Sequence, residues 1–251
     1  MITKPRQARK KSDSGIYHIM LRGVNNQQIF EEREDYEKFI SILKTCKSIC
    51  EFKIYAYCLM GNHIHLLIQE TKEPIELIIK RIATRFVYWY NIKYQRAGHL
   101  FQDRFRSEPI DDERYFLAVL RYIHQNPVKA GICQKIEGYN YSSYNEFFKN
   151  SYLIDTDFVF EVINKDEFVS FNNEVTTDDF LDAENRQKIK VTDEEAQKII
   201  EKYSKCKSIV EFQALDKRVR DKSLKIFKEK GLSIRQISRL TGTSYYLVQK
   251  A

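Results

Sequence analysis

Two histidines separated by a single residue are the side chains of this chain best suited to hold a metal ion. His63 and His65 flank Ile64 in a run of β-forming residues that follows Gly61-Asn62. Because successive side chains of a strand point to opposite faces, both imidazoles lie on one face and Ile64 on the other. Two imidazoles side by side are a ready pair of metal ligands. The motif is short, and two surface or hydrogen-bonded histidines without a metal are the alternative.

A tyrosine and an asparagine near the end of a later helix form a second pair. Tyr122 and Asn126 are four residues apart, so they share a helical face and lie one turn from each other. An amide oxygen can join the ligand set of a metal, and a tyrosine hydroxyl one turn away can reach a phosphate that the metal holds. The alternative is a packed tyrosine and an asparagine before a proline. His124 lies on a different helical face from Tyr122, and we assign it no role.

The elements that must position these residues follow the order β-α-β-β-α-β. Alternating apolar runs predict strands, apolar residues at i, i+3, i+4 and i+7 predict helices, and Gly61-Asn62 is a two-residue hairpin signal. The predicted elements are strand Ile16–Arg22, helix Arg33–Cys50, strands Lys53–Met60 and His63–Gln69, a helix from Pro74 to about Tyr94 and a strand at 106–110. A third helix starts after Asp111 or Asp112 and is expected to end near Gln125, because Pro127 follows. This order describes a ferredoxin-like α+β sandwich with an antiparallel sheet.

Charge divides the chain into three parts. Residues 1–150 carry a net charge of +7, residues 151–190 carry −6, and residues 191–251 carry +6. We expect a domain with the candidate site in the first part, an acidic linker or docking strap in the second, and a small helical tail in the third. The strap could also lie across a basic groove as an inhibitor. The basic first and third parts favour a polyanionic partner.

Basic residues interleaved with aromatics suit single-stranded nucleic acid, because phosphates meet the cations and bases stack on the rings. In the first part, the residues expected to contact nucleic acid are Arg6, Arg9, Lys10, Arg81, Arg85, His99, Arg104 and Arg106. The aromatic residues after Arg85 could equally be core residues, and Trp89 is then the ring that we expect to be buried. We expect His18, on the first strand, to be structural.

The last residues of the chain have the spacing of a helix-turn-helix. Gly242 lies in the turn, and Ser233 and Ser244 (or Thr243) can cap the two helices. The side chains expected to contact phosphates or base edges are Arg235, Arg239, Tyr245 and Lys250. A helical pair that serves only for packing is the alternative.

Composition excludes several classes of protein. Hydrophobic residues make up 43% and charged residues 31%, which excludes a chain that is disordered as a whole. No stretch approaches the roughly 18 apolar residues that span a bilayer, so we expect a cytoplasmic protein without a membrane partner. Five cysteines without a CxxC pair favour reduced thiols over disulfides or a zinc ribbon. Cys46 and Cys50 are expected to face the same core as Ile64, which disfavours a zinc site shared with the histidines.

Several motifs, taken in order, resemble the HUH single-tyrosine transposases, particularly the REP-associated tyrosine transposases. They lie within residues 14–148 and read YHIMLRGVNNQQIF, MGNHIHLL, YWYNIKYQRAGHLFQDRFRS and YIHQNPVKAG. The resemblance implies a ferredoxin-like fold, which agrees with the order of elements. It also implies that His63 and His65 are the metal-binding pair, that Asn126 is the third ligand, and that Tyr122 is the nucleophile. Residues 1–150 would then be the catalytic domain, and 191–251 a DNA-binding tail.

The implied chemistry is the cutting and rejoining of DNA strands. Mg²⁺ or Mn²⁺ would neutralise charge on the scissile phosphate while Tyr122 attacks it, leaving a 5′-phosphotyrosine and a 3′-hydroxyl. The prediction is a metal-dependent single-strand endonuclease and strand transferase that acts beside hairpin or palindromic ends. We expect a monomer or homodimer whose tail contacts duplex DNA. A DNA-binding regulator that does not cut and an RNA-binding protein are the alternatives, since stacking platforms do not separate DNA from RNA.

Overall fold

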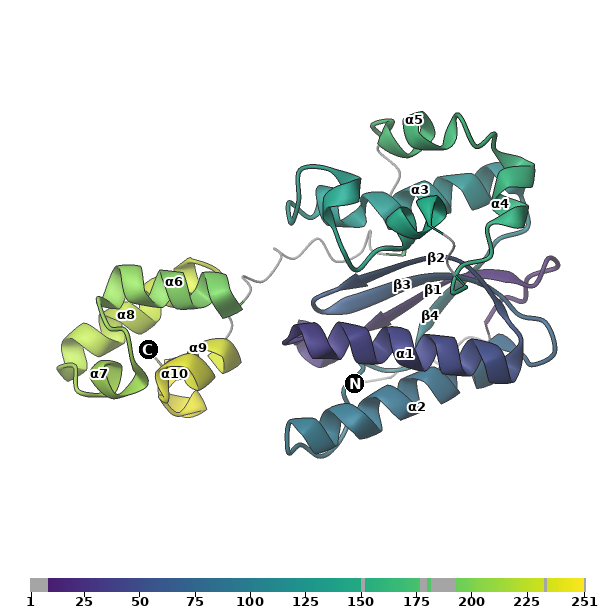
Figure 1. Ribbon diagram of the computed structural model, residues 1–251. Helices are drawn as coiled ribbons and strands as arrows, with labels where there is room; N and C mark the ends of the chain where they lie inside the picture. Colours follow the sequence, from purple (N-terminus) through teal and green to yellow (C-terminus); the bar gives the residue numbers. More distant parts are fainter. Residues whose placement is uncertain (1–8, 150–151, 177–179, 182–192, 233, 251) are drawn as a thin grey trace. The chain divides into compact units, whose positions relative to one another are not determined.

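The chain folds into two compact units, Met1–Asn185 and Arg186–Ala251. The computed structural model describes residues 9–149, 152–176, 180–181, 193–232 and 234–250 (Figure 1). Among these residues, no helix is both long and apolar enough to cross a membrane.

Four antiparallel strands form the sheet of the first unit, in the order β2-β3-β1-β4 (Figure 1). The strands are β1 (Ile16–Arg22), β2 (Lys53–Met60), β3 (His63–Gln69) and β4 (Arg106–Pro109). Gly61 and Asn62 alone join β2 to β3, as the hairpin signal predicted. The order along the chain and the order in the sheet are those of a ferredoxin-like sandwich, so the predicted fold class is confirmed.

Helices cover both faces of this sheet (Figure 1). On one face lie α1 (Arg33–Cys50) and α2 (Ile75–Lys93). On the other lies α3 (Glu113–Lys129), with α4 (Asp157–Val162) and α5 (Phe168–Asn173) beyond it. Short 3-10 helices occupy Val24–Asn26, Ile136–Gly138 and Ser143–Phe148.

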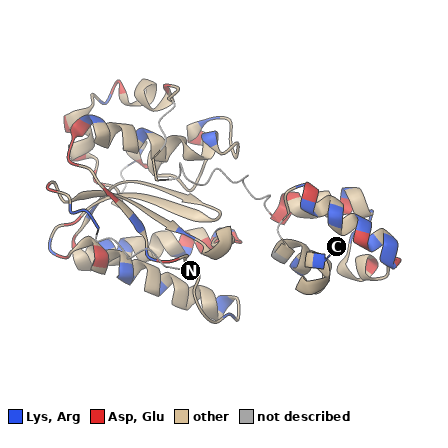
Figure 2. Ribbon diagram, turned by 180° about the vertical axis from the view of Figure 1, so that it is seen from behind, with Lys and Arg blue, Asp and Glu red and all other residues tan. Residues whose placement is uncertain are grey.

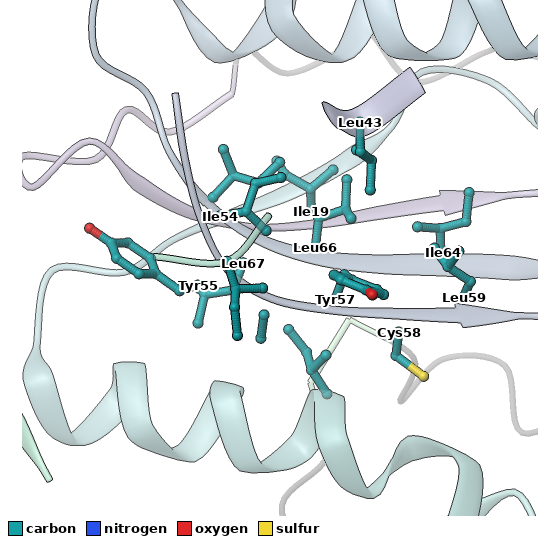
Figure 3. Packing of buried hydrophobic residues seen from close by; sticks show 14 of the residues in the cluster. Ile19, Leu43, Ile54, Tyr55, Tyr57, Cys58, Leu59, Ile64, Leu66 and Leu67 are labelled. Carbon is teal, nitrogen blue, oxygen red and sulfur yellow. The ribbon is translucent and has the colours of Figure 1, made fainter. Parts of the chain in front are cut away.

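The two faces of the sheet carry different side chains. Ile19 and Leu66 are direct partners on β1 and β3, and they lie beside Leu43 of α1 on one side of the sheet (Figure 3). Cys58 of β2 points to the other side, the face that it shares with its direct partner His65 on β3 (Figure 3). Burying apolar side chains contributes about 25 cal/mol per Å², so both helical layers stabilise the sheet. All five cysteines are unpaired thiols, as expected.

The third helix begins as predicted but ends later. The side chain of Asp112 accepts a hydrogen bond from the backbone N–H of Tyr115, which caps the first turn. The prediction that Pro127 ends the helix near Gln125 is wrong, because α3 continues to Lys129. Proline removes one N–H donor, and the last turn keeps the 2.9 Å bond from the N–H of Ala130 to the carbonyl of Asn126. Pro127 is also buried, so its packing offsets the lost bond.

The described part of the acidic segment 151–190 packs against the first unit. Its apolar residues Leu153, Ile154, Val159, Ile163 and Phe168 are buried in the core of the sandwich. Of the two arrangements expected for this segment, these residues form a docked strap and not a free linker. The net charge of −6 therefore does not mark a boundary between folded units.

The second unit is a bundle of short helices with its own core. It contains α6 (Asp193–Ser204), α7 (Ile209–Gln213), α8 (Lys217–Glu229), α9 (Ile234–Thr241) and α10 (Tyr245–Lys250). Helices α9 and α10 form the predicted helix-turn-helix, with Gly242 at φ +66° in the turn. A Cβ on Gly242 would lie 2.6 Å from Cγ2 of Ile209, so the turn requires glycine. Ser244 caps α10 through the backbone N–H of Leu247, whereas the expected cap Ser233 lies outside the described residues.

A buried histidine joins α3 to the segments that follow it. Nδ1 of His124 lies 2.8 Å from Oδ1 of Asn172 on α5, and Nε2 lies 3.0 Å from the hydroxyl oxygen of Ser143. Burial lowers the pKa of His124 to about 4, although the hydrogen bond with Asn172 acts in the opposite direction. His124 is therefore neutral in the folded protein and has a structural role.

We expect the first unit to become less stable as the pH is lowered, because His124 is neutral in the folded protein. The pKa in the folded state lies below the unfolded value of about 6.5, so this stabilisation is complete above pH 6.5 and is lost as the pH falls towards 4. The loss from His124 amounts to at most about 3 kcal/mol. Urea unfolding of wild type and His124→Gln at pH 7.5 and 4.5 measures it. Equal losses in the two proteins would contradict this account.

Candidate active site

Strand pairing brings both predicted metal-binding histidines to the face of the sheet that α3 covers. Arg22 and Met60 flank His63 across the strands, and Met20 and Cys58 flank His65. The ring of Tyr122, on α3, lies edge-on to His65 with 5.6 Å between ring centres. The predicted nucleophile and one of the predicted metal ligands are thus in contact.

Both histidines use the same ring nitrogen for a hydrogen bond within the protein. Nδ1 of His63 lies 2.7 Å from Oδ1 of Asn62, and Nδ1 of His65 lies 2.9 Å from Nε2 of His18. With Nδ1 engaged in each ring, Nε2 is the atom through which each would coordinate a metal. The two ring centres are 5.0 Å apart. This arrangement fits a shared divalent ion.

The predicted third ligand is the amide of Asn126. Among the described residues, no three His, Cys, Asp or Glu side chains gather as a metal site. Asn126 lies one turn along α3 from Tyr122, is only 7% exposed, and belongs to the regular helix that continues past Pro127. An amide oxygen of Asn126 is a suitable third ligand, next to oxygens of a bound phosphate.

The structure adds three residues that the sequence analysis did not assign to the site. His18, expected to be structural, contacts His65 and lies 6.0 Å from the ring of Tyr122. Nζ of Lys129 lies 5.2 Å from the centre of that ring, and the ring of Phe180 lies 4.8 Å from it. The i, i+7 spacing from Tyr122 could have indicated Lys129, because such residues share a helical face. No local pattern could have indicated His18 or Phe180, which lie in other segments.

The carboxylate of Glu108 contacts the ring of His18. Oε2 of Glu108, on β4, is 3.7 Å from Nδ1 of His18, which is an ion-pair distance. Burial raises the pKa of Glu108, but His18 and Tyr115 lower it more, so this pKa lies below its usual value. Burial and Glu108 in turn raise the pKa of Tyr115. Glu108 is therefore ionised at neutral pH.

Some of the predicted DNA contacts gather beside β4. The guanidinium of Arg9 lies 3.7 Å from the ring centre of Phe105 and donates to the Phe105 carbonyl. Burial and the neighbouring Arg104 lower the pKa of Arg9. Arg106 is exposed on β4 and donates to the carbonyl of Leu181 at 3.2 Å. Lys10 and His99 are exposed, and Arg6 lies outside the described residues.

The long helix α2 carries the other predicted contacts. Arg81 and Arg85 are exposed, and Arg81 forms an ion pair with Glu73. The expectation that Trp89 is the buried ring is wrong. Phe86 and Tyr90 point into the core, whereas Trp89 is partly buried, with the ammonium groups of Lys38 and Lys93 over it. Phe86 lies edge-on to Phe39 of α1 with 5.1 Å between ring centres, so the face of α2 that carries Phe86 and Tyr90 is the buried one.

The predicted contacts of the tail lie on α9 and α10. Arg239 forms an ion pair with Asp193 at 2.5 Å, so α6 already engages this side chain. Tyr245 and Lys250 are exposed, and the side chain of Arg235 lies outside the described residues. Figure 2 shows basic segments on helices of both units.

Three comparisons show which known proteins this chain is similar to. Residues 11–126 match the family of IS200-like transposases. A Haemophilus influenzae protein named as a REP-associated tyrosine transposase is 30% identical over 113 residues, which cover 39% of this chain and 64% of the relative. The chain thus spans slightly less than two thirds of that relative.

A solved structure has a similar fold. It is the REP-associated tyrosine transposase bound to a REP hairpin, with a TM-score of 0.54 at 15% identity over 71% of this chain and 96% of the other. The residues that match the family include all four strands of the sheet and α3 as far as Asn126. They therefore include the histidine pair and Tyr122. Residues 11–126 of this chain are therefore similar to the IS200-like transposases.

Proposed function

We propose that this protein is a metal-dependent DNA endonuclease and strand transferase that cuts a single strand beside hairpin or palindromic ends. The observation that carries the proposal is the contact between the ring of Tyr122 and the ring of His65, whose partner His63 lies 5.0 Å further on. A nucleophile and a metal-binding pair on facing elements are what phosphodiester transfer needs.

Tyr122 would attack the scissile phosphorus through Oη. The new O–P bond replaces the bond to the 3′-oxygen, which leaves with a proton as a 3′-hydroxyl, and the 5′-phosphate stays on Tyr122. Attack by a 3′-hydroxyl on this phosphotyrosine reverses the step and joins strands without ATP. An unperturbed tyrosine has a pKa of about 10, so the attacking phenolate needs nearby positive charge. The ammonium of Lys129, 5.2 Å from the ring centre, is one source.

Nε2 of His63, Nε2 of His65 and the amide oxygen of Asn126 would hold the metal, which polarises the scissile phosphate when it is bound. Two imidazole nitrogens are unusual ligands for Mg²⁺, which prefers oxygen. The donor set therefore favours Mn²⁺ over Mg²⁺. The hairpin substrate is proposed because the structural relative was solved bound to a REP hairpin.

Removing the attacking oxygen should abolish cleavage and leave binding intact. Tyr122→Phe keeps the ring that packs on His65, so we expect unchanged affinity for a hairpin oligonucleotide and a loss of cleavage of at least about a thousandfold. Denaturing gels that detect a covalent protein–DNA adduct measure this. An adduct formed by Tyr122→Phe would identify another nucleophile. An RNA hairpin of the same sequence is the second substrate, and an adduct with RNA alone would favour RNA processing.

Removing the histidine pair should abolish the metal-dependent cleavage. We expect His63→Ala with His65→Ala to lower cleavage in Mn²⁺ by at least about a hundredfold, because each loses a ligand nitrogen. Ile49→Ala, at an exposed position of α1 on the opposite side of the sheet, is the control and should cut normally. Full activity of the wild type in EDTA would rule out the metal.

The tail is proposed to anchor the protein on duplex DNA beside the hairpin. Residues 191–251 carry a net charge of +6 and contain the helix-turn-helix α9–α10. Because residues 152–176 complete the core of the first unit, the chain should be shortened after Asn185 and not after Asn150. Truncation there should spare cleavage of a short hairpin while it weakens binding to a duplex-flanked site and flattens the salt dependence. Equal salt dependence for the two proteins would leave the tail a packing unit.

The acidic segment is proposed to restrain Tyr122 through Phe180. The Phe180 ring lies 4.8 Å from that of Tyr122 and 6.3 Å from that of His18. An aromatic pair contributes about 0.5–1.5 kcal/mol, so Phe180→Ala should raise cleavage about two- to tenfold. Val175→Ala, at a position that is 98% exposed in the same segment, is the control. Unchanged or slower cleavage by Phe180→Ala would argue against restraint.

A further inference from the structure

The buried chain of polar side chains behind His65 crosses three strands. It runs from Glu108 on β4 through His18 on β1 to His65 on β3, and the register makes His18 the direct neighbour of Glu108. Both imidazoles are 0% exposed, and their rings are stacked with 5.2 Å between centres. Burying two imidazoles is costly unless each polar nitrogen has a partner, so the hydrogen bond between them stabilises the fold.

Only one proton can lie between Nε2 of His18 and Nδ1 of His65, which are 2.9 Å apart. If that proton belongs to His18, the neutral ring of His65 carries its own proton on Nε2 and cannot coordinate through it. If the proton belongs to Nδ1 of His65, Nε2 of His65 has a lone pair for a metal. In that case neutral His18 carries its proton on Nδ1, the nitrogen that faces Glu108.

The carboxylate of Glu108 decides between these two arrangements. Its Oε2 lies 3.7 Å from Nδ1 of His18, and a negative charge there favours a proton on that nitrogen. A proton on Nδ1 of His18 makes Nε2 the acceptor, and His65 must then donate. Glu108 thus influences the position of the proton on His65 through the imidazole of His18. Asn62, in contrast, contacts Nδ1 of His63 directly, at 2.7 Å.

We propose that His18, supported by Glu108, is a positioning residue that holds His65 in the tautomer that coordinates the metal. The proposal rests on the proposed function, since it requires His65 to be a ligand. Partners of this kind typically change metal affinity about 10- to 100-fold. His18 also contacts Tyr122 at 6.0 Å between ring centres, so the same side chain touches both the nucleophile and the ligand.

Imidazole tautomers in the metal-free full chain give the first test. Long-range ¹H–¹⁵N spectra show which nitrogen of each ring carries the proton, and with only five histidines the signals can be assigned by single substitutions. We expect His65 of the wild type to carry its proton on Nδ1. In His18→Phe, which keeps an aromatic ring but offers no acceptor, the Nε2 tautomer should become populated. A wild-type His65 protonated on Nε2 would overturn the proposal.

Direct binding of Mn²⁺, followed by electron paramagnetic resonance, gives the second test. We expect the dissociation constant to rise about 10- to 100-fold in His18→Phe and several-fold in Glu108→Gln. Glu113→Gln, which removes the same charge at the exposed start of α3, should bind like the wild type. If His18→Phe does not fold, Glu108→Gln alone tests the proposal. A dissociation constant of Glu108→Gln equal to that of the wild type would then refute the positioning role of Glu108 and His18.

The two proposals fail in different ways. If His63→Ala takes up Mn²⁺ as tightly as the wild type, the metal role of the histidine pair fails and the proposed function with it. If His63→Ala loses Mn²⁺ while His18→Phe and Glu108→Gln retain it, the proposed function stands and the positioning role of His18 is excluded.

Discussion

The packing of α3 across one face of the sheet is the constraint on which the candidate site depends. Tyr122 is 4% exposed and lies against His65 and His18, so its hydroxyl can reach a phosphate only where the helix and the sheet meet. The helix holds this place because its apolar face is buried on β2 and because its start is capped by Asp112. Loss of that packing would separate Tyr122, the proposed nucleophile, from the histidines without altering either of them.

Polar side chains on this face are tolerated because they satisfy one another. His18, His65 and His124 are all 0% exposed, and each has a hydrogen-bond partner in the first unit. Burial lowers the pKa of His124, so this imidazole is neutral at pH 7. The hydrogen bond between His18 and His65 fixes the orientation of both rings, so the packing that stabilises the sandwich also holds His65 beside Tyr122.

The segment after α3 lies outside the residues that match the transposase family, and it contacts α3. Gln125 donates to the backbone carbonyls of Asn172 and Glu174, and Arg121 forms an ion pair with Glu174. These contacts hold the segment against the same helix that presents Tyr122. A net charge of −6 gave no sign of such docking, because the docking depends on apolar residues and backbone carbonyls.

The sequence by itself determined the order of elements, the strand that carries His63 and His65, and the helical face shared by Tyr122 and Asn126. These follow from local periodicity, hairpin chemistry and spacing, which depend only on neighbours along the chain. Where a choice depended on distant neighbours, sequence reasoning failed. Pro127 does not end α3, because packing offsets its missing donor. Trp89 is not the buried ring, because Phe86 of the same helix packs on Phe39 of α1.

Only the tertiary structure decided which residues surround Tyr122. His18 reaches His65 because β1 lies between β3 and β4, and Phe180 reaches Tyr122 because the chain returns across α3. Pairing of strands that are 47 residues apart cannot be read from local pattern, since one strand can accept several partners until the whole sheet is assembled. The sequence therefore determines the chemical groups, and the fold determines which of them act together, because contacts between distant segments form only when the core packs.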